Sequence, residues 1–219
     1  AVTLQTSPLE DFDNAALKRG CDLIVSAGLL IFVFPFVYLI FGTLIKLSSP
    51  GPIFFRQKRS GLNGKEFDCY KFRSMRVNAD SDSKQATEHD PRKTRIGDFM
   101  RRTNIDELPQ LINVFLGDMS LVGPRPHMLK HTEEYSALID KYMMRHFVRP
   151  GITGWAQVNG RNAISWPEKF RLDVWYVENR SLLLDIKILF LTVKKVLDRS
   201  SINSEGEATA AKFTGNDDA

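Results

Sequence analysis

An uncharged, strongly apolar run over residues 23–45 constrains the fold more than any other feature of the chain. It is long enough to cross a bilayer as a helix, which takes about 20 apolar residues. Pro35 lies near its centre, where it removes a backbone donor and clashes with the preceding turn. The run is therefore expected to form two helices joined by a bend at Pro35.

Basic residues lie on both sides of this run: Lys18 and Arg19 precede it, and Lys46 and Arg56 follow it. A segment that crosses the membrane completely and obeys the positive-inside rule carries its basic residues mainly on one side. The balanced flanks favour a re-entrant segment that bends at Pro35 and returns to the face from which it entered. A kinked complete span and a buried helix of a soluble domain are the alternatives.

The rest of the chain predicts a mixed α+β fold that is mostly helical. Two short apolar stretches, residues 53–55 and 67–72, flank a Gly-Leu-Asn-Gly turn and indicate a small β-hairpin. Residues 117–126 are expected to form a rigid, turn-rich stretch. Further helices are expected at residues 96–102, 108–116, 133–148, 165–178 and 182–197. The last of these suits an amphipathic helix at a membrane interface, or else a buried core helix.

The composition narrows the class of partner. A net charge of +4 suits nucleic acid, anionic lipid or a phosphorylated small molecule. No nucleic-acid recognition motif accompanies the charge, and the apolar run argues against that class of ligand. Cys21 and Cys69 provide neither a disulfide framework nor the spacing of a zinc site, which indicates a reducing compartment. The four histidines form no metal-binding pattern.

Asp106 and Glu107 are the strongest candidates for chemistry. They stand just before Pro109, and proline is favoured in the first turn of a helix, so both carboxylates are expected at a helix N-terminus. That position stabilises carboxylates and attracts phosphates. The alternative is an ordinary pair of first-turn acids that complements the helix dipole.

Basic residues beside glycine and proline turns give this acidic pair a context. Rigid backbone holds guanidinium groups in place for binding phosphate. A single basic side chain is usually a solvated surface group, but several together on turns indicate a phosphate site. The candidates are Lys71, Arg73, Arg101, Arg125, Arg149 and Arg161.

Five motifs resemble those of the bacterial sugar transferases, the monotopic polyprenyl-phosphate phosphoglycosyl transferases. They are Ser-Pro-Gly-Pro at 49–52, Lys-Phe-Arg-Ser-Met at 71–75, Asp-Glu-Leu-Pro-Gln-Leu at 106–111, Gly-Asp-Met-Ser-Leu-Val-Gly-Pro-Arg-Pro at 117–126, and Arg-Pro-Gly-Ile-Thr-Gly-Trp-Ala-Gln-Val-Asn-Gly-Arg at 149–161. The likeness covers roughly residues 18–200. Several long motifs in the same order make it specific.

The resemblance implies a covalent reaction in two steps, with Asp106 as the nucleophile. Asp106 would attack the β-phosphate of a UDP-sugar and release UMP, and polyprenyl (undecaprenyl) phosphate would then accept the phosphosugar. Glu107 would help to hold Mg²⁺, which offsets the negative charge of the diphosphate. The implied phosphate or nucleotide contacts are Lys71, Arg101, Arg125 and Arg161.

The resemblance also implies a re-entrant helix in the inner membrane of a bacterium, contact with membrane lipid and an active site on the cytoplasmic face. Phe34 stands before the bend, where some members carry a serine that can bond the freed carbonyls. Residues 159–166, together with Gly206 and residues 212–215, resemble short members that use N-acetylamino sugars, so a UDP-linked N-acetylamino sugar is favoured. Residues 8–19 resemble the junction of longer members with an upstream regulatory domain. The oligomeric state stays open, a homo-oligomer included.

The chain is accordingly divided into a leader or linker (1–17), a re-entrant membrane helix (18–48), a cytoplasmic catalytic domain (49–200) and a polar tail (201–219). A membrane-anchored scaffold that binds nucleotide-sugars without turnover is one rival hypothesis, and the presence of both acids argues against it. A hydrolase, in which water resolves the aspartyl intermediate, is a second rival. An apolar entrance that faces the membrane disfavours it.

Overall fold

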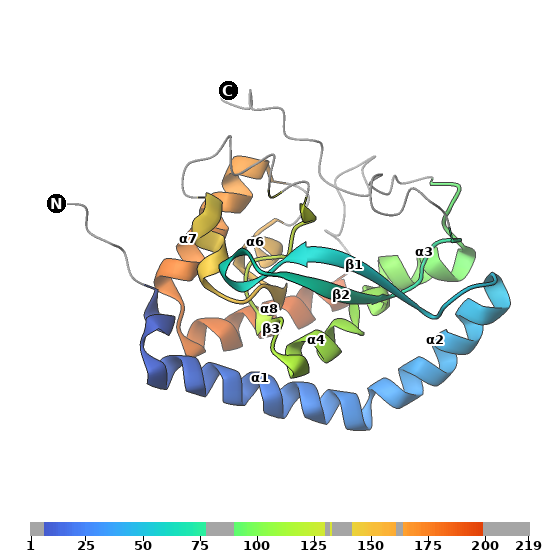
Figure 1. Cartoon of the computed structure of the whole chain (residues 1–219), viewed down its shortest axis with the longest axis horizontal. Helices are drawn as coiled ribbons and strands as arrows, with labels where there is room; N and C mark the ends of the chain where they lie inside the picture. Colours follow the sequence, from blue (N-terminus) through green and yellow to red (C-terminus); the bar gives the residue numbers. More distant parts are fainter. Residues whose placement is uncertain (1–6, 78–89, 130–131, 133–141, 161–163, 199–219) are drawn as a thin grey trace.

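The computed structural model describes residues 7–77, 90–129, 132, 142–160 and 164–198 of the 219-residue chain. The fold is mostly helical, and a long bent pair of helices runs along one edge of it (Figure 1). The helices are α1 (Phe12–Phe32), α2 (Phe34–Ser48), α3 (Arg95–Arg102), α4 (Gln110–Leu116), α6 (Trp155–Val158), α7 (Trp166–Asn179) and α8 (Leu182–Asp198). The strands are β1 (Phe54–Ser60), β2 (Glu66–Phe72), β3 (Ser120–Val122) and β4 (Gly151–Thr153). Short 3₁₀ turns are η1 (Pro8–Glu10), η2 (Leu62–Gly64), η3 (Ile105–Glu107) and η4 (Tyr142–Phe147).

The apolar run forms α1 and α2, which are bent by 55° at Val33. Pro35 lies in the first turn of α2, where its missing N–H leaves no hydrogen bond unmade, so the predicted bend is confirmed. Among the described residues, no single helix is long and apolar enough to cross a membrane, whereas this bent pair is when taken together. Whether the pair re-enters or spans a membrane stays a prediction. Helix α1 begins at Phe12, earlier than the boundary expected at residue 18.

Phe34 packs at the bend. Its ring stacks with those of Phe72, at a centroid distance of 5.9 Å, and Phe54, at 6.4 Å. These rings belong to an apolar cluster around Ile45, Phe72 and Met100 that joins α2 to the hairpin and α3. The residue that cannot bond the carbonyls freed by the bend therefore holds the bend against the rest of the fold.

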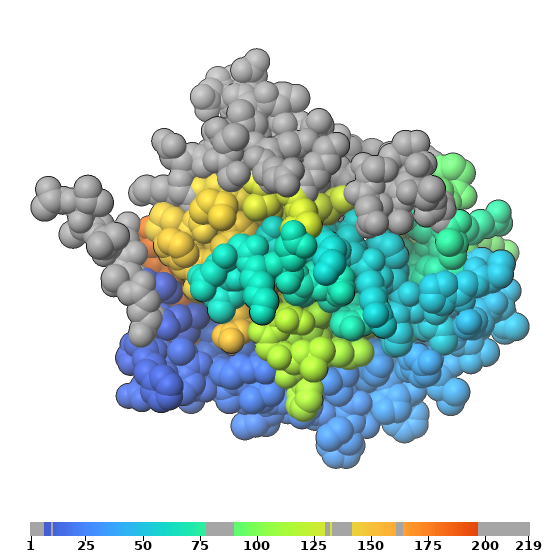
Figure 2. Space-filling view, viewed as in Figure 1, coloured from blue at the N-terminus to red at the C-terminus, as the bar shows by residue number. Residues whose placement is uncertain are grey.

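The predicted hairpin is confirmed. β1 and β2 pair antiparallel from Phe54 opposite Phe72 to Ser60 opposite Glu66. Asn63 (φ 53°) and Gly64 (φ 74°) take the left-handed conformations that a tight turn needs, which asparagine and glycine tolerate best. In Figure 2 the hairpin lies across this face of the molecule, above α1 and α2.

A second small sheet was not predicted. β3 lies within residues 117–126, which were expected to form only turns, and it pairs parallel with β4. The backbones of these two segments lie so close together that a Cβ on Gly123 would collide with the backbone of Arg149, and a Cβ on Gly151 with the backbone of Gly123. The glycines of these motifs therefore allow the two segments to approach each other closely, and they do not serve only to form turns.

The remaining helices agree with the sequence in part. α3, α4, α7 and α8 match the stretches expected at 96–102, 108–116, 165–178 and 182–197. The helix expected at 133–148 lies largely outside the described residues, and its end forms the 3₁₀ turn η4. α8 buries Ile188 and exposes Leu183 and Phe190 on its other side, so it is amphipathic. Its place at a membrane interface stays a prediction.

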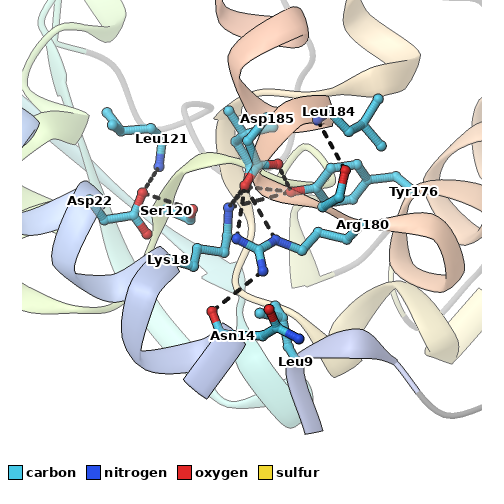
Figure 3. Close-up of polar contacts among 12 residues, drawn as sticks. Leu9, Asn14, Lys18, Asp22, Ser120, Leu121, Tyr176, Arg180, Leu184 and Asp185 are labelled. Carbon is cyan, nitrogen blue, oxygen red and sulfur yellow. Dashed lines mark hydrogen bonds and ion pairs between the residues drawn. The ribbon is translucent and has the colours of Figure 1, made fainter. Parts of the chain in front are cut away.

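Helix α1 is fastened to the globular part by buried charges (Figure 3). The ammonium group of Lys18 contacts Asp185 on α8 at 2.9 Å, and Arg180 contacts the same carboxylate at 3.2 Å. The Tyr176 hydroxyl on α7 donates to the other oxygen of Asp185 at 2.6 Å. We call Lys18, Tyr176, Arg180 and Asp185 the anchor cluster. Asp22, one turn further along α1, accepts hydrogen bonds from Ser120 and Leu121 of β3.

Candidate active site

Asp106 and Glu107 lie in the 3₁₀ turn η3, directly ahead of helix α4. The turn opens at Asn104, whose backbone is left-handed (φ 57°), a conformation that asparagine adopts more readily than most residues. Pro109 then precedes the first residue of α4. The two acids thus lie near a helix N-terminus, as expected, but in a separate tight turn rather than in the first turn of α4.

The Glu107 carboxylate is held by two cations. Arg125 donates from both terminal nitrogens, to Oε2 at 3.1 Å and to Oε1 at 2.5 Å. Lys71, near the end of β2, donates to Oε1 at 2.7 Å. Burial by itself raises the pKa of Glu107, but the charges and hydrogen bonds of Arg125 and Lys71 outweigh it and hold that pKa well below its usual range. Glu107 is therefore an anion that fixes the positions of both cations.

Asp106 has a different environment, although it is the adjacent residue. It is only 6% exposed, and its carboxylate forms no hydrogen bond or ion pair with any residue that the structure describes. Burial raises the pKa of Asp106 to about 6, with Lys71 opposing the rise and Glu107 adding to it. At neutral pH Asp106 is therefore a poorly compensated anion whose lone pairs are available, as a nucleophilic carboxylate requires.

Further positive charge reaches Asp106 from Arg101 and Arg125, both of which lower its pKa. Arg101, at the end of α3, donates from Nε to the Ser74 hydroxyl at 2.8 Å. Its two terminal nitrogens have no partner in the described part of the chain. The structure thus gathers three of the predicted basic residues, Lys71, Arg101 and Arg125, around the carboxylate pair.

Arg73 makes different contacts. Its terminal nitrogens donate to the backbone oxygens of Pro50 at 2.7 Å and Ser49 at 2.8 Å, and the residue is 5% exposed. These bonds fasten the end of the hairpin to the loop after α2. Arg73 was predicted to contact substrate, and its described contacts are instead to backbone oxygens of the loop after α2.

Arg149 lies at the other end of α4. Its Nε donates to the Gly117 oxygen at 2.7 Å, and Arg19 donates to the oxygens of Val114 and Phe115. The two arginines therefore bind the carbonyls at the end of this helix. A seven-residue helix is about 10 Å long, so Arg149 is separated from the carboxylate pair. Arg161, the remaining predicted contact, lies outside the described residues.

Two contacts that support the site were not predicted from the sequence. Asn113 is a polar residue in the middle of the mostly apolar helix α4. Its side chain accepts a hydrogen bond from the Tyr70 N–H and donates one to the Asp68 backbone oxygen, and these bonds connect α4 to β2 beside Lys71. A polar residue in such a helix is a detectable signal. Arg145 donates to the backbone oxygen of Arg125, and nothing in its spacing indicates this contact.

The carboxylate pair retains an acceptor position that a divalent cation could use, provided that the substrate supplies further ligands. Among the described residues, no group of three or more His, Cys, Asp or Glu side chains could hold a metal ion. A carboxylate offers about four acceptor positions. Glu107 uses two on Oε1 and one on Oε2, so Oε2 retains one. The pair therefore fits Mg²⁺ that is shared with substrate phosphates, for which one or two carboxylate ligands suffice.

Comparison with known proteins places this site in a family. The family profile for bacterial sugar transferases matches residues 13–199. The chain is 48% identical over 200 residues to the UDP-glucose:undecaprenyl-phosphate glucose-1-phosphate transferase of Escherichia coli (strain K12), with 89% of this chain and 43% of that protein aligned. It is 52% identical over 165 residues to the protein of the same name from Xanthomonas campestris pv. campestris, with 72% and 34% aligned.

A shorter relative matches over nearly its whole length. The uncharacterized sugar transferase EpsL of Bacillus subtilis (strain 168) is 48% identical over 203 residues, which are 92% of this chain and 98% of that protein. The chain therefore spans less than half the length of the two larger relatives and almost all of the smaller one. The profile match and these identities show that the chain belongs to the bacterial sugar transferase family.

Proposed function

We propose that the chain is a phosphoglycosyl transferase that moves a sugar-1-phosphate from a UDP-sugar to polyprenyl (undecaprenyl) phosphate, with release of UMP. The names of the Escherichia coli and Xanthomonas relatives describe transfer of glucose 1-phosphate from UDP-glucose to undecaprenyl phosphate. The observation that carries the proposal is Asp106, a buried carboxylate without a described partner that is surrounded by cations.

In the first step, a carboxylate oxygen of Asp106 attacks the β-phosphorus of the UDP-sugar. A new P–O bond forms, and the bond from that phosphorus to the bridging oxygen breaks. UMP leaves with the bridging oxygen and its electron pair. In the second step, an oxygen of polyprenyl phosphate attacks the same phosphorus, and the Asp106 carboxylate leaves unchanged.

The cations around Asp106 suit this reaction. A carboxylate and a diphosphate repel each other, and fixed positive charge lowers that repulsion and stabilises the phosphoryl group in transfer. Glu107 binds Arg125 on both oxygens and Lys71 on one, which keeps these cations near Asp106 without a direct ion pair to it. Asp106 therefore keeps its reactivity inside a positive field. Glu107 would help to hold Mg²⁺, which would supply further positive charge for the diphosphate.

The position of the site suits a lipid acceptor. Ile105, the residue before Asp106, packs against the apolar cluster that contains Phe34 and Phe41 of α2. Large apolar side chains of α2 are exposed, among them Phe36 and Leu39 at 68% and 69%. We infer that α1 and α2 form a re-entrant anchor in the bacterial inner membrane, and that Asp106 lies at its cytoplasmic face, where a polyprenyl phosphate can reach it.

Two observations favour different donor sugars. The two larger relatives use UDP-glucose by name, whereas residues 159–166 resemble members that act on N-acetylamino sugars. A panel that contains UDP-glucose, UDP-N-acetylglucosamine and UDP-N-acetylgalactosamine therefore decides the donor. It should include UDP-galactose, which differs from UDP-glucose in one hydroxyl configuration.

The deciding experiment measures UMP release in detergent from each UDP-sugar, with and without undecaprenyl phosphate and Mg²⁺. Release should require the lipid beyond a single turnover, require Mg²⁺, and vanish in Asp106→Asn. A burst of one UMP per chain without lipid would support the aspartyl intermediate. Arg171→Lys, at an exposed position of α7, is the matched control and should behave as the parent.

The rival functions give different results. Continuous release without lipid, together with free sugar 1-phosphate, would indicate a hydrolase. Nucleotide-sugar binding without any release would indicate the scaffold hypothesis. Turnover that persists in Asp106→Asn would exclude Asp106 as the nucleophile.

A further inference from the structure

A buried ion pair contacts the backbone of Arg125. Arg145 in η4 and Asp173 on α7 meet at 2.8 Å, and their side chains are only 2% and 6% exposed. Neither residue contacts the carboxylate pair, and the reaction proposed above does not use them. A pair this deeply buried is costly to form, so its other contacts indicate what it does.

Arg145 joins this ion pair to the backbone that carries Arg125. The nitrogen that meets Asp173 also donates to the backbone oxygen of Arg125, at 2.6 Å. The second terminal nitrogen donates to the Tyr142 hydroxyl at 3.3 Å, and that hydroxyl is 2.9 Å from Nδ1 of His127. Arg145 therefore contacts the chain at Arg125 directly and at His127 through Tyr142.

The surroundings of Arg145 restrict its movement. Its guanidinium lies over the rings of Tyr142 and Phe170, 5.4 and 5.8 Å from the ring centroids. The ring of Phe170 packs edge-on against that of Tyr142 at 5.0 Å. A guanidinium enclosed by rings and paired at both terminal nitrogens has one orientation. The backbone of Arg125 is therefore fixed to α7 through Arg145.

We propose that Arg145 is a positioning residue that holds Arg125 so that its guanidinium binds both oxygens of Glu107. This rests on the proposed function for its effect on turnover, although the geometric statement does not depend on it. Arg125 lies between Pro124 and Pro126, which restrict the local backbone but do not orient it relative to η3. The bond from Arg145 to the Arg125 oxygen supplies that orientation, and Asp173 holds Arg145 in turn.

A double-mutant cycle tests this proposal. Turnover is compared in the parent, Arg125→Ala, Arg145→Lys and the double variant. Lysine keeps the charge but cannot form the same set of bonds, so Arg145→Lys should lower kcat by about 10- to 100-fold and change KM for the UDP-sugar less. In the Arg125→Ala background the same change should lower kcat less than about twofold, because residues that act through one another are not additive. Equal losses in both backgrounds would overturn the proposal.

A second readout needs no substrate. Selective ¹⁵N labelling of arginine, with Arg125→Ala to assign the signals, reports the hydrogen bonds of the Arg125 guanidinium. A displaced Arg125 should lose its two bonds to Glu107, so its terminal N–H signals should shift and exchange faster with water in Arg145→Lys. If the parent releases no UMP, the proposed function fails, and these spectra still test the positioning. Unchanged Arg125 signals in Arg145→Lys would contradict it.

Controls separate positioning from a general loss of structure. Arg171→Lys changes an exposed arginine on the same helix as Asp173, where it pairs with Glu168 at 2.7 Å, and should alter neither readout. If Arg145→Lys does not fold, Asp173→Asn replaces it, since asparagine keeps an acceptor for Arg145. The expected results are the same in direction and smaller in size, and the same additive outcome would overturn the proposal.

Discussion

The anchor cluster and the cluster of charged side chains around η3 are both buried, and they differ in how their carboxylates are paired. In the anchor cluster, both oxygens of Asp185 accept hydrogen bonds from cations or from a hydroxyl (Figure 3). In the cluster around η3, Glu107 is bound in the same way, whereas Asp106 has no partner among the described residues. Burial is similar, at 6% exposure for both Asp185 and Asp106, so the difference lies in the pairing.

The difference shows how one chain can use buried charge for two purposes. A buried carboxylate that is fully paired contributes to the folded structure, and removal of one partner leaves an uncompensated charge. A buried carboxylate that is left unpaired destabilises the fold and gains reactivity. We expect substitution of the paired Asp185 and of the unpaired Asp106 to change the free energy of unfolding in opposite directions.

The largest effect on stability is expected in the anchor cluster. Asp185→Asn removes the negative charge and leaves Lys18 and Arg180 buried, so the free energy of unfolding should fall by about 3 to 5 kcal/mol. Urea unfolding in detergent measures this change. Asp68→Asn is the control, because Asp68 pairs with Lys58 at the surface at 3.6 Å, and such a pair contributes less than about 1 kcal/mol. Similar losses at the two positions would show that the anchor cluster is not special.

A smaller loss is expected at Glu107. Glu107→Gln leaves Lys71 and Arg125 without their shared anion, but the Arg125 side chain is 37% exposed and can find water, so the loss should be about 2 to 3 kcal/mol. Unfolding in urea again gives the value. UMP release should fall as well, because the two cations are then free to pair with Asp106. If Glu107→Gln leaves both stability and turnover unchanged, Glu107 has no role in the site.

The sequence predicts those parts of the fold that rest on local chemistry. The bend at Pro35 follows from the missing donor of proline, and the hairpin follows from a turn that contains Asn63 and Gly64. The parallel pairing of β3 with β4 could not be predicted in this way. Each strand has three residues, too few to show a period, and the partners are about thirty positions apart in sequence.

The residues of the site could likewise be predicted from the sequence only in part. Residue type and proximity to glycine or proline identified Lys71, Arg101 and Arg125, which do lie around the carboxylate pair. The same criteria also selected Arg73 and Arg149, whose described contacts are to backbone carbonyls elsewhere. A sequence states which residues carry a guanidinium, but the tertiary fold decides which acceptor each guanidinium meets.

At Asp106 a substitution is expected to raise the free energy of unfolding, in contrast to the losses expected at Asp185 and Glu107. Asp106→Asn replaces a buried anion that has no described partner by a neutral group of the same shape, so it should raise the free energy of unfolding by about 2 to 3 kcal/mol at pH 7.5. The same variant should lose UMP release. A more stable but inactive variant would confirm the contrast with Asp185. A destabilised Asp106→Asn would mean that the carboxylate has a structural role and would break the comparison.

The pH dependence of this gain separates it from other causes. Burial raises the pKa of Asp106 from 3.8 to about 6, so the folded chain binds the proton more tightly than the unfolded chain does. The resulting stabilisation is fully present below about pH 4 and is lost as the pH rises through about 6. The stability advantage of Asp106→Asn over the parent should therefore widen from about 1 kcal/mol at pH 4.5 to about 2 to 3 kcal/mol at pH 7.5. Turnover of the parent should change in the same interval, because only ionised Asp106 is a nucleophile, and should fall by about tenfold for each unit below pH 6. A stability difference that does not vary with pH would mean that Asp106 has an ordinary pKa, and its burial would then have no catalytic meaning.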